Sequence, residues 1–177
     1  MKKILFAVVA VLAVVSLASS GSAAGKAKRS YQAPQESSSR QGHFDVGGGF
    51  GLTVRSPVQF DINTGVRYFL WEDISLGLDV DTLIRGTTAF AVTAGGRYHF
   101  DIPPLPELVP YAGLGLGGVF DVNGGKAMNI SVPDLGFDYE ILHNFFLGPE
   151  FSVNILTDFE DTTWNVRILF VKATYRF

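Results

Sequence analysis

The sequence predicts an all-β fold, an eight-stranded antiparallel up-and-down transmembrane barrel that follows a cleavable N-terminal signal peptide. Two observations predict it. Apolar and polar residues alternate with a period of two through 43–177, which is the pattern of strands with one apolar and one polar face. No later apolar run reaches the roughly 20 residues that a membrane-spanning helix needs, so any passage through a bilayer must use strands.

Composition narrows the function classes. The chain contains 17 acidic and 14 basic residues, and this mildly acidic balance argues against a nucleic-acid partner. It has no cysteine, which excludes disulfides, thiolate metal sites and cysteine nucleophiles. We expect no cofactor, because no spacing of metal ligands or phosphate-binding glycines stands out.

The chain divides into three segments. Residues 1–24 have the features of a signal peptide: Lys2 and Lys3, an apolar stretch from Ile4 to Ala18, and small residues at Ser22–Ala24. Residues 25–42 are polar and rich in Ser, Gln, Lys and Arg, so we expect a disordered periplasmic tail. Residues 43–177 form the predicted barrel.

Short turn-forming breaks separate the predicted strands. Each predicted strand is long enough to cross a membrane at a tilt. Because short turns join the eight strands, neighbouring strands should be antiparallel. A bilayer does not tolerate unpaired edges, so the sheet should close. The longest loop is expected at Asp121–Ser131. The predicted strands are His43–Val54, Val58–Leu70, Ile74–Ile84, Thr88–Phe100, Val109–Phe120, Val132–Ile141, Phe145–Leu156 and Trp164–Phe177.

The final strand shows the alternation most clearly. Leu169, Val171, Ala173, Tyr175 and Phe177 are expected on its apolar outer face, with the polar residues between them facing inward. Four features form one pattern: the strand rhythm, this terminal strand, the PYAGLGLGG stretch at 110–118 and the run at Gly136–Tyr139. The pattern resembles the small eight-stranded outer-membrane barrels of the OmpA transmembrane-domain and OmpX type.

The resemblance covers the signal peptide and residues 43–177. It implies an integral protein of the bacterial outer membrane, porin-like in architecture, with both termini in the periplasm. Its partners would be outer-membrane lipids, lipopolysaccharide and the barrel-assembly machinery, which would engage the C-terminal strand at Tyr175 and Phe177. The predicted surface loops are shorter than is usual in that family, which weakens an adhesin or receptor function.

Inward-facing charges are the candidate functional residues. Unpaired charges in a narrow lumen are costly, so they should pair into a network that closes the barrel, which favours a structural, membrane-integrity role. The alternative is a narrow path for ions or small solutes. The predicted network comprises Asp45, Asp61, Arg67, Asp79, Asp81, Arg97, Asp138, Glu140, Glu150, Lys172 and Arg176.

Three further hypotheses have less support. A soluble lipocalin-like carrier would need its many large apolar side chains inside the barrel. A lipid A-modifying enzyme needs a nucleophile beside a base, and His43, His99 and His143 have no serine two or three residues away. Recognition of lipopolysaccharide phosphates would rest on the scattered cations Arg55, Arg85 and Lys126.

Overall fold

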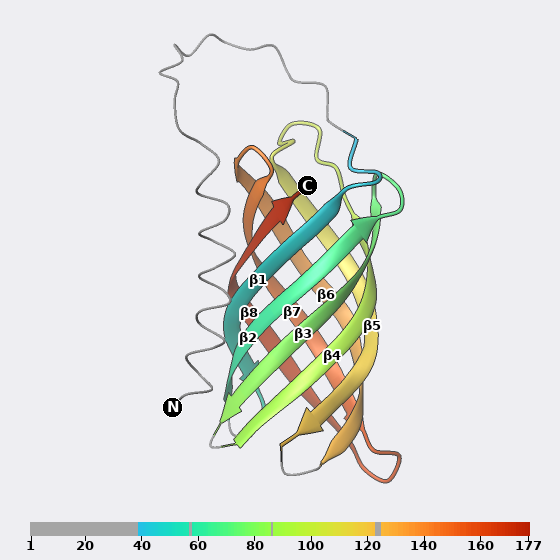
Figure 1. The fold of residues 1–177 in the computed structure, drawn as a ribbon, viewed down its shortest axis with the longest axis vertical. Coiled ribbons are helices and arrows are strands. Elements are labelled where there is room, and N and C mark those ends of the chain that lie inside the picture. The colour runs from blue at the N-terminus through green and yellow to red at the C-terminus, as the bar shows by residue number, and fades with distance from the viewer. Residues whose placement is uncertain (1–38, 57, 86, 123–124) are drawn as a thin grey trace. The chain divides into compact units, whose positions relative to one another are not determined.

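The computed structural model describes residues 39–56, 58–85, 87–122 and 125–177. The predicted signal peptide, and the predicted tail up to residue 38, lie outside the described residues. The strands form one closed barrel in the order β1 to β8, with antiparallel neighbours throughout and β8 paired to β1 (Figure 1). This confirms the predicted fold class. No helix in the described part of the chain is long and apolar enough to cross a membrane.

The barrel has two distinguishable ends. The terminal end carries the first residue of β1 and the last residue of β8, and the opposite end carries the β1–β2, β3–β4, β5–β6 and β7–β8 connections. The strands are β1 Phe44–Val54, β2 Gln59–Phe69, β3 Ile74–Arg85, β4 Thr87–His99, β5 Leu108–Asp121, β6 Lys126–Leu142, β7 Phe145–Thr157 and β8 Thr162–Arg176.

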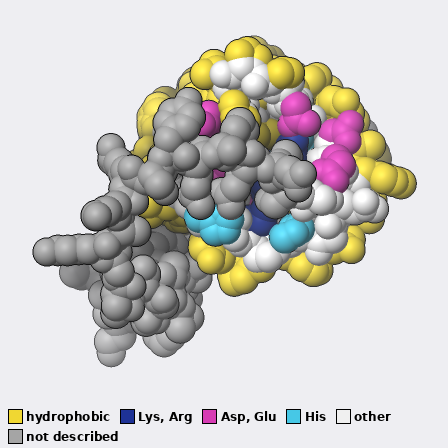
Figure 2. Space-filling view, turned by 90° about the horizontal axis from the view of Figure 1, so that it is seen from above, with side chains coloured by type: hydrophobic (Ala, Val, Ile, Leu, Met, Phe, Trp, Pro, Cys, Tyr) yellow, Lys and Arg dark blue, Asp and Glu magenta, His cyan; other side chains and the backbone are white. Residues whose placement is uncertain are grey.

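The two faces of the sheet are inverted relative to a soluble barrel. Large apolar side chains such as Leu76, Leu114 and Phe170 are exposed on the outside, whereas Asp61, Ser75 and Ser152 are fully buried inside. From the terminal end, hydrophobic side chains surround an interior in which basic side chains are visible (Figure 2). A polar interior and an apolar exterior rule out the lipocalin-like carrier and match a barrel that faces lipid.

The β5–β6 connection differs from the expectation. β6 begins at Lys126, six residues before the predicted strand, and only 122–125 separate it from β5, so the predicted long loop at Asp121–Ser131 is wrong. Residues 126–131 continue the alternation, with Asn129 and Ser131 buried towards the lumen. The longest connection is instead the proline-rich segment 100–107 at the terminal end.

A β-bulge in β8 corrects the predicted faces of that strand. Phe170 and Val171 both point outward, and the registers with β1 and β7 shift at this point. A bulge adds one residue and reverses the phase of the alternation beyond it. Leu169, expected on the outer face, is therefore 0% exposed and points inward, and Arg167 also enters the lumen.

Residues 39–42, which the tail prediction included, belong to the same compact unit as the barrel. We call them the strap. The Ser39 hydroxyl and the Arg40 backbone N–H donate to the Glu72 carboxylate, the latter at 3.0 Å, and the Arg40 guanidinium pairs with Asp101. These two hydrogen bonds hold the pKa of Glu72, which lies in the β2–β3 turn, below its ordinary value.

Candidate functional site

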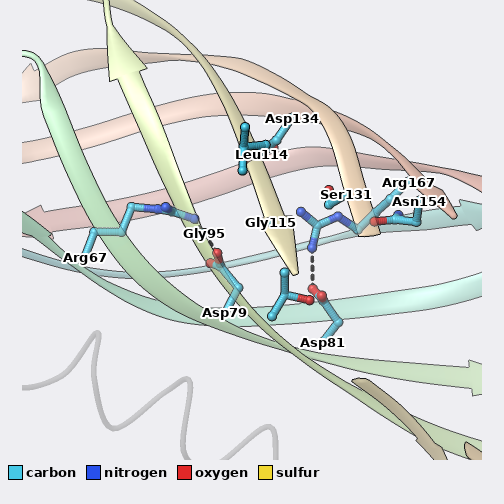
Figure 3. Close-up of a pocket in the computed structure, with 11 residues that line it drawn as sticks. Arg67, Asp79, Asp81, Gly95, Leu114, Gly115, Ser131, Asp134, Asn154 and Arg167 are labelled. Carbon is cyan, nitrogen blue, oxygen red and sulfur yellow. Dashed lines mark hydrogen bonds and ion pairs between the residues drawn. The ribbon is translucent and has the colours of Figure 1, made fainter. Parts of the chain in front are cut away.

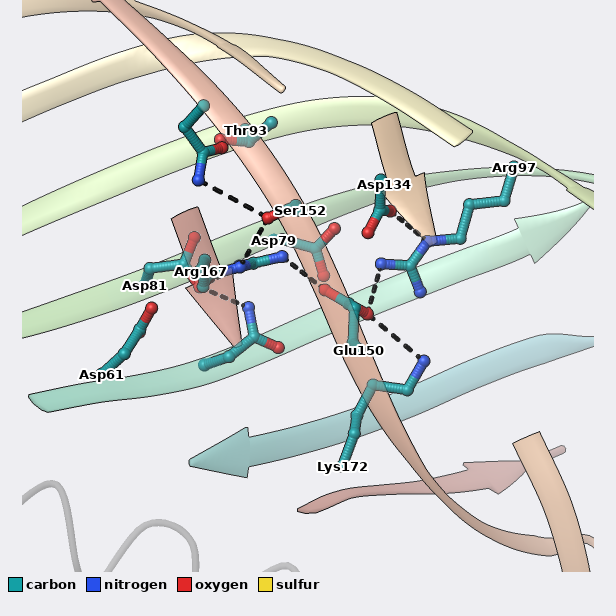
Figure 4. A network of polar contacts seen from close by, with 12 residues as sticks. Asp61, Asp79, Asp81, Thr93, Arg97, Asp134, Glu150, Ser152, Arg167 and Lys172 are labelled. Carbon is teal, nitrogen blue, oxygen red and sulfur yellow. Dashed lines mark hydrogen bonds and ion pairs between the residues drawn. The ribbon is translucent and has the colours of Figure 1, made fainter. Parts of the chain in front are cut away.

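The lumen is organised around Glu150 on β7, which is 2% exposed (Figure 4). Its carboxylate accepts hydrogen bonds from Arg97 Nη2 at 2.6 Å and from the Tyr111 hydroxyl at 2.9 Å. Arg167 Nη2 also donates to it, and Lys172 Nζ lies 3.5 Å away. One carboxylate is thus shared by three cations and a phenol. We call this cluster of Glu150, Arg97, Arg167, Lys172 and Tyr111 the Glu150 hub.

Each cation of the hub has a second carboxylate. Arg97 Nε donates to Asp134 at 2.7 Å, and Arg167 Nη1 donates to Asp81 at 2.5 Å. Lys172 Nζ lies 3.2 Å from Asp138 Oδ1. The hub and its outer carboxylates therefore hold together β3, β4, β6, β7 and β8 across the lumen, with both members of every pair buried.

Among the described residues, two further ion pairs lie within the lumen but outside the hub. Arg67 on β2 pairs with Asp79 on β3, and Arg176 on β8 makes two hydrogen bonds of 2.8 Å to Asp45 on β1. Asp61 is different, because its Oδ2 accepts from the Thr53 hydroxyl at 3.1 Å while its buried Oδ1 has no hydrogen-bond partner in the part of the chain that the structure describes. It is a buried carboxyl without a cation bonded to it.

The structure places every sequence-predicted network residue in the lumen except Glu140. That side chain is 35% exposed and accepts a hydrogen bond from the Asn144 backbone N–H at 2.9 Å, with His143 Nδ1 at 4.0 Å. Glu140 therefore supports the β6–β7 turn at the terminal end, where it lies near the end of β6 and pairs with Phe146 of β7. Assigning it to the lumen network was wrong.

The sequence interpretation missed Asp134, Arg167 and Tyr111. Asp134 continues the inward alternation of Gly136 and Asp138, so this signal was present. Arg167 carried no such signal, because counting in twos from the C-terminus puts it outside until the bulge is known. A second register shift, between Ser131 and Asp134 on β6, lets Asn129 and Ser131 face the lumen as well, although they are in the opposite phase to Asp134.

Tyr111 fits the lumen because its cross-strand partner on β6 is Gly136. A Cβ at Gly136 would lie 2.5 Å from Tyr111 Cζ, so only glycine leaves room for the ring. The ring in turn lies under two cations, with Arg97 Cζ and Lys172 Nζ each 4.4 Å from its centroid. Glycine at 136 is thus a requirement of the hub.

The described part of the lumen includes two small cavities lined mainly by polar residues, each of about 20 Å³, which is room for about one water molecule. Arg67 and Asp79 line both cavities. The first, shown in Figure 3, is also lined by Asp81, Thr93, Gly95, Leu114, Gly115, Ser131, Asp134, Asn154 and Arg167. The second is also lined by Asp45, Gly47, Asn63, Gly65, Arg97, His99, Asp138, Lys172 and Thr174.

A serine and a histidine do meet in the lumen, although they are far apart in sequence. Ser75 Oγ on β3 lies 2.9 Å from His99 Nε2 on β4. The serine is 0% and the histidine 2% exposed, and none of the described residues forms a hydrogen bond with His99 Nδ1. The pair lacks an orienting acid and access for a substrate. Within the described ranges no group of three His, Cys, Asp or Glu side chains is arranged to hold a metal ion.

Comparison with known proteins supports the fold. No protein-family model matches the chain, and no curated protein matches it significantly in sequence. Among solved structures, it is similar to Neisserial surface protein A (TM-score 0.58, 15% identity), with 76% of this chain and 96% of that one covered.

Two Pseudomonas aeruginosa proteins are also similar. For the N-terminal β-barrel domain of OprF the TM-score is 0.55 and the identity 21%, with 77% of this chain and 98% of that chain covered. For the outer membrane protein OprG the TM-score is 0.52 and the identity 12%, with 77% of this chain and 96% of that chain covered. The chain has the fold of these small outer-membrane barrels.

Proposed function

We propose that this protein is an integral barrel of the bacterial outer membrane with a structural, membrane-integrity role, and that its lumen is closed by the Glu150 hub. The observation that carries the proposal is the combination of an exposed apolar exterior with a lumen filled by charges that, apart from Asp61, are held in ion pairs. An apolar exterior is poorly solvated by water and well solvated by the hydrocarbon of a bilayer.

Aromatic side chains support a membrane position. The terminal end carries three pairs of aromatic rings in contact. The two ring centroids lie 4.7 Å apart in Phe44–Tyr68, 5.0 Å apart in Tyr98–Phe100 and 4.8 Å apart in Tyr175–Phe177. At the opposite end Trp164 is 70% exposed. Rings at both rims match the aromatic girdles of transmembrane barrels. By analogy with such barrels, the terminal end faces the periplasm.

The first experiment is electrophoresis of the outer-membrane fraction in SDS, unheated beside boiled. A closed barrel resists cold SDS, so the unheated protein should migrate differently from the boiled protein. Conductance across planar bilayers then tests the closed lumen. We expect no stable conductance, because the lumen cavities hold about one water each. A protein recovered from the soluble periplasmic fraction without a mobility shift would contradict the proposal.

A narrow pore is the second candidate. Its support is that Arg67 and Asp79 line both cavities, so this single ion pair divides two polar spaces. The double variant R67A/D79A removes the partition without leaving an unpaired charge. New conductance in this variant, but not in the matched double variant D45A/R176A, would favour the pore. Silence in both would favour the closed barrel.

We further propose that the protein is not an enzyme. The Ser75–His99 pair is the hydroxyl–imidazole contact that most resembles a nucleophile with its base, and both side chains face the lumen rather than the lipid. Ser75→Ala should leave the lipid A of the host membrane unchanged by mass spectrometry. A lipid A species lost in that variant and restored with wild type would contradict this.

The C-terminal strand is the proposed contact with the barrel-assembly machinery. The Phe177 backbone N–H donates to Phe44 O at 2.8 Å, while its ring is 67% exposed beside Tyr175 and available to a partner. Deleting Phe177 should lower the amount inserted in cells more than it lowers the yield of folding into detergent micelles. An equal loss in both would assign Phe177 to barrel stability instead.

A further inference from the structure

The charges of the lumen do not balance. Among the described residues the lumen holds seven carboxylates, those of Asp45, Asp61, Asp79, Asp81, Asp134, Asp138 and Glu150, and five bases, Arg67, Arg97, Arg167, Lys172 and Arg176. The buried Arg40 of the strap pairs with Asp101 and leaves this difference unchanged. The Arg67–Asp79 and Arg176–Asp45 pairs are neutral. The hub has three cations for Glu150 and its three outer carboxylates, and Asp61 has no bonded cation. An excess of buried negative charge is costly unless something positive compensates it.

The first cavity is where this excess can be compensated. Three carboxylates, of Asp79, Asp81 and Asp134, line it together with two guanidinium groups, of Arg67 and Arg167. Asp134 is 7% exposed, and its Oδ1 has no hydrogen-bond partner among the described residues, although its Oδ2 accepts from Arg97 at 2.7 Å. A carboxylate oxygen only accepts, so its missing partner must be a donor or a cation.

The remaining lining fits a small cation. The side chains of Thr93, Ser131 and Asn154 carry neutral oxygen atoms at the same cavity (Figure 3 shows Ser131 and Asn154). Oxygen ligands suit hard cations. The volume of about 20 Å³ admits one water-sized ion and excludes an organic cation. Among the described residues no three His, Cys, Asp or Glu side chains are arranged to coordinate one metal ion, and this holds for the three carboxylates of the cavity. That arrangement argues against a tightly held divalent metal.

We propose that the first cavity is a binding site for one small monovalent cation, such as Na⁺ or K⁺, held by Asp134 Oδ1 and the neighbouring oxygen atoms. The bound cation cancels part of the excess charge of the hub, and so stabilises the closed barrel. This property is additional to the structural role proposed above and does not require conduction.

The test is the urea midpoint of unfolding in nonionic detergent micelles. NaCl or KCl is exchanged stepwise for N-methyl-D-glucamine chloride at constant ionic strength, so general screening stays the same. A ligand that binds only the folded protein raises its stability with concentration. We expect the midpoint to rise with the small cation, since the organic cation is too large to enter. An identical midpoint in all three salts would overturn the proposal.

A matched pair of variants locates the effect. Asp134→Asn should abolish the difference between NaCl and the organic salt. Asp61→Asn removes the same charge from a buried carboxylate that does not line the cavity, so the difference should persist. Loss of the difference in Asp61→Asn alone would overturn the assignment to this cavity.

Two wild-type measurements remain informative should Asp134→Asn fail to fold. Crystals grown with Rb⁺ in place of K⁺ should show an anomalous peak beside Asp134 Oδ1, and a lumen without such a peak would count against the site. If protons supply the compensating charge instead, the midpoint will rise as the pH falls and will not respond to the salt. That result would also overturn the proposal, while leaving the cold-SDS mobility shift of the barrel unaffected.

Discussion

Replacing Glu150 with glutamine tests whether the hub organises the barrel. The substitution keeps the shape of the side chain but removes the charge that Arg97, Arg167 and Lys172 share. Breaking a buried ion pair by removing one partner costs about 3–5 kcal/mol. Each cation keeps its outer carboxylate, and the excess negative charge of the lumen falls by one, so both effects reduce the loss. We therefore expect destabilisation of about 3 kcal/mol, at the lower end of that range.

Urea unfolding of the purified barrel in micelles, followed by tryptophan fluorescence, measures this loss. Glu140→Gln is the matched control, since it makes the same chemical change in a half-buried side chain of the β6–β7 turn. It should cost less than about 1 kcal/mol, the value of an ordinary hydrogen bond. If the two variants lose the same free energy of unfolding, with unchanged dependence on urea, Glu150 is not the organising residue of the lumen.

Three other outcomes can be checked. Gly136→Ala should displace the Tyr111 ring and cost about 1–3 kcal/mol by overpacking, whereas Gly125→Ala in a connecting loop, where the nearest atom to an added Cβ is 3.6 Å away, should be nearly neutral in the same urea assay. Deleting Val171 removes the bulge and would turn Arg167 towards the lipid, at a cost of about 2–4 kcal/mol for an arginine at mid-membrane. The fast- or slow-migrating band of the folded barrel in cold SDS should then disappear. Val171→Ala keeps the bulge and should retain that band. The attachment of the strap should depend on pH through Glu72, whose pKa is lowered in the folded protein. The stabilisation that Glu72 gives the strap is complete above the pKa of the unfolded chain, near 4.5, and is lost as the pH falls through the lower pKa of the folded protein. A spin label at Gln41→Cys, in a chain without native cysteine, should become more mobile in that acidic range. Glu72→Gln should raise its mobility at every pH, while the Arg40–Asp101 pair still holds part of the strap.

The sequence alone determined the architecture and the two faces of most strands. A period of two in β1 to β4 is local information, because each side chain alternates regardless of what lies across the lumen. Asp45, Asp61, Arg67 and Asp81 could therefore be assigned to the interior before any partner was known. The same counting failed for β8, because a bulge leaves no composition signal and reverses every side chain beyond it.

The tertiary structure decided which charges meet. Arg97 and Glu150 are far apart in the chain and on strands that are not neighbours, so their 2.6 Å contact depends on the closure of the barrel and on the tilt of its strands. Arg167 reaches the hub because the bulge on β8 turns it inward, whereas Asp134 lies in the same inward phase as Asp138. The alternation of the sequence defined what the lumen contains, whereas strand register, which is set by pairing between distant segments, decided how those charges are partnered and which carboxylates remain without a partner.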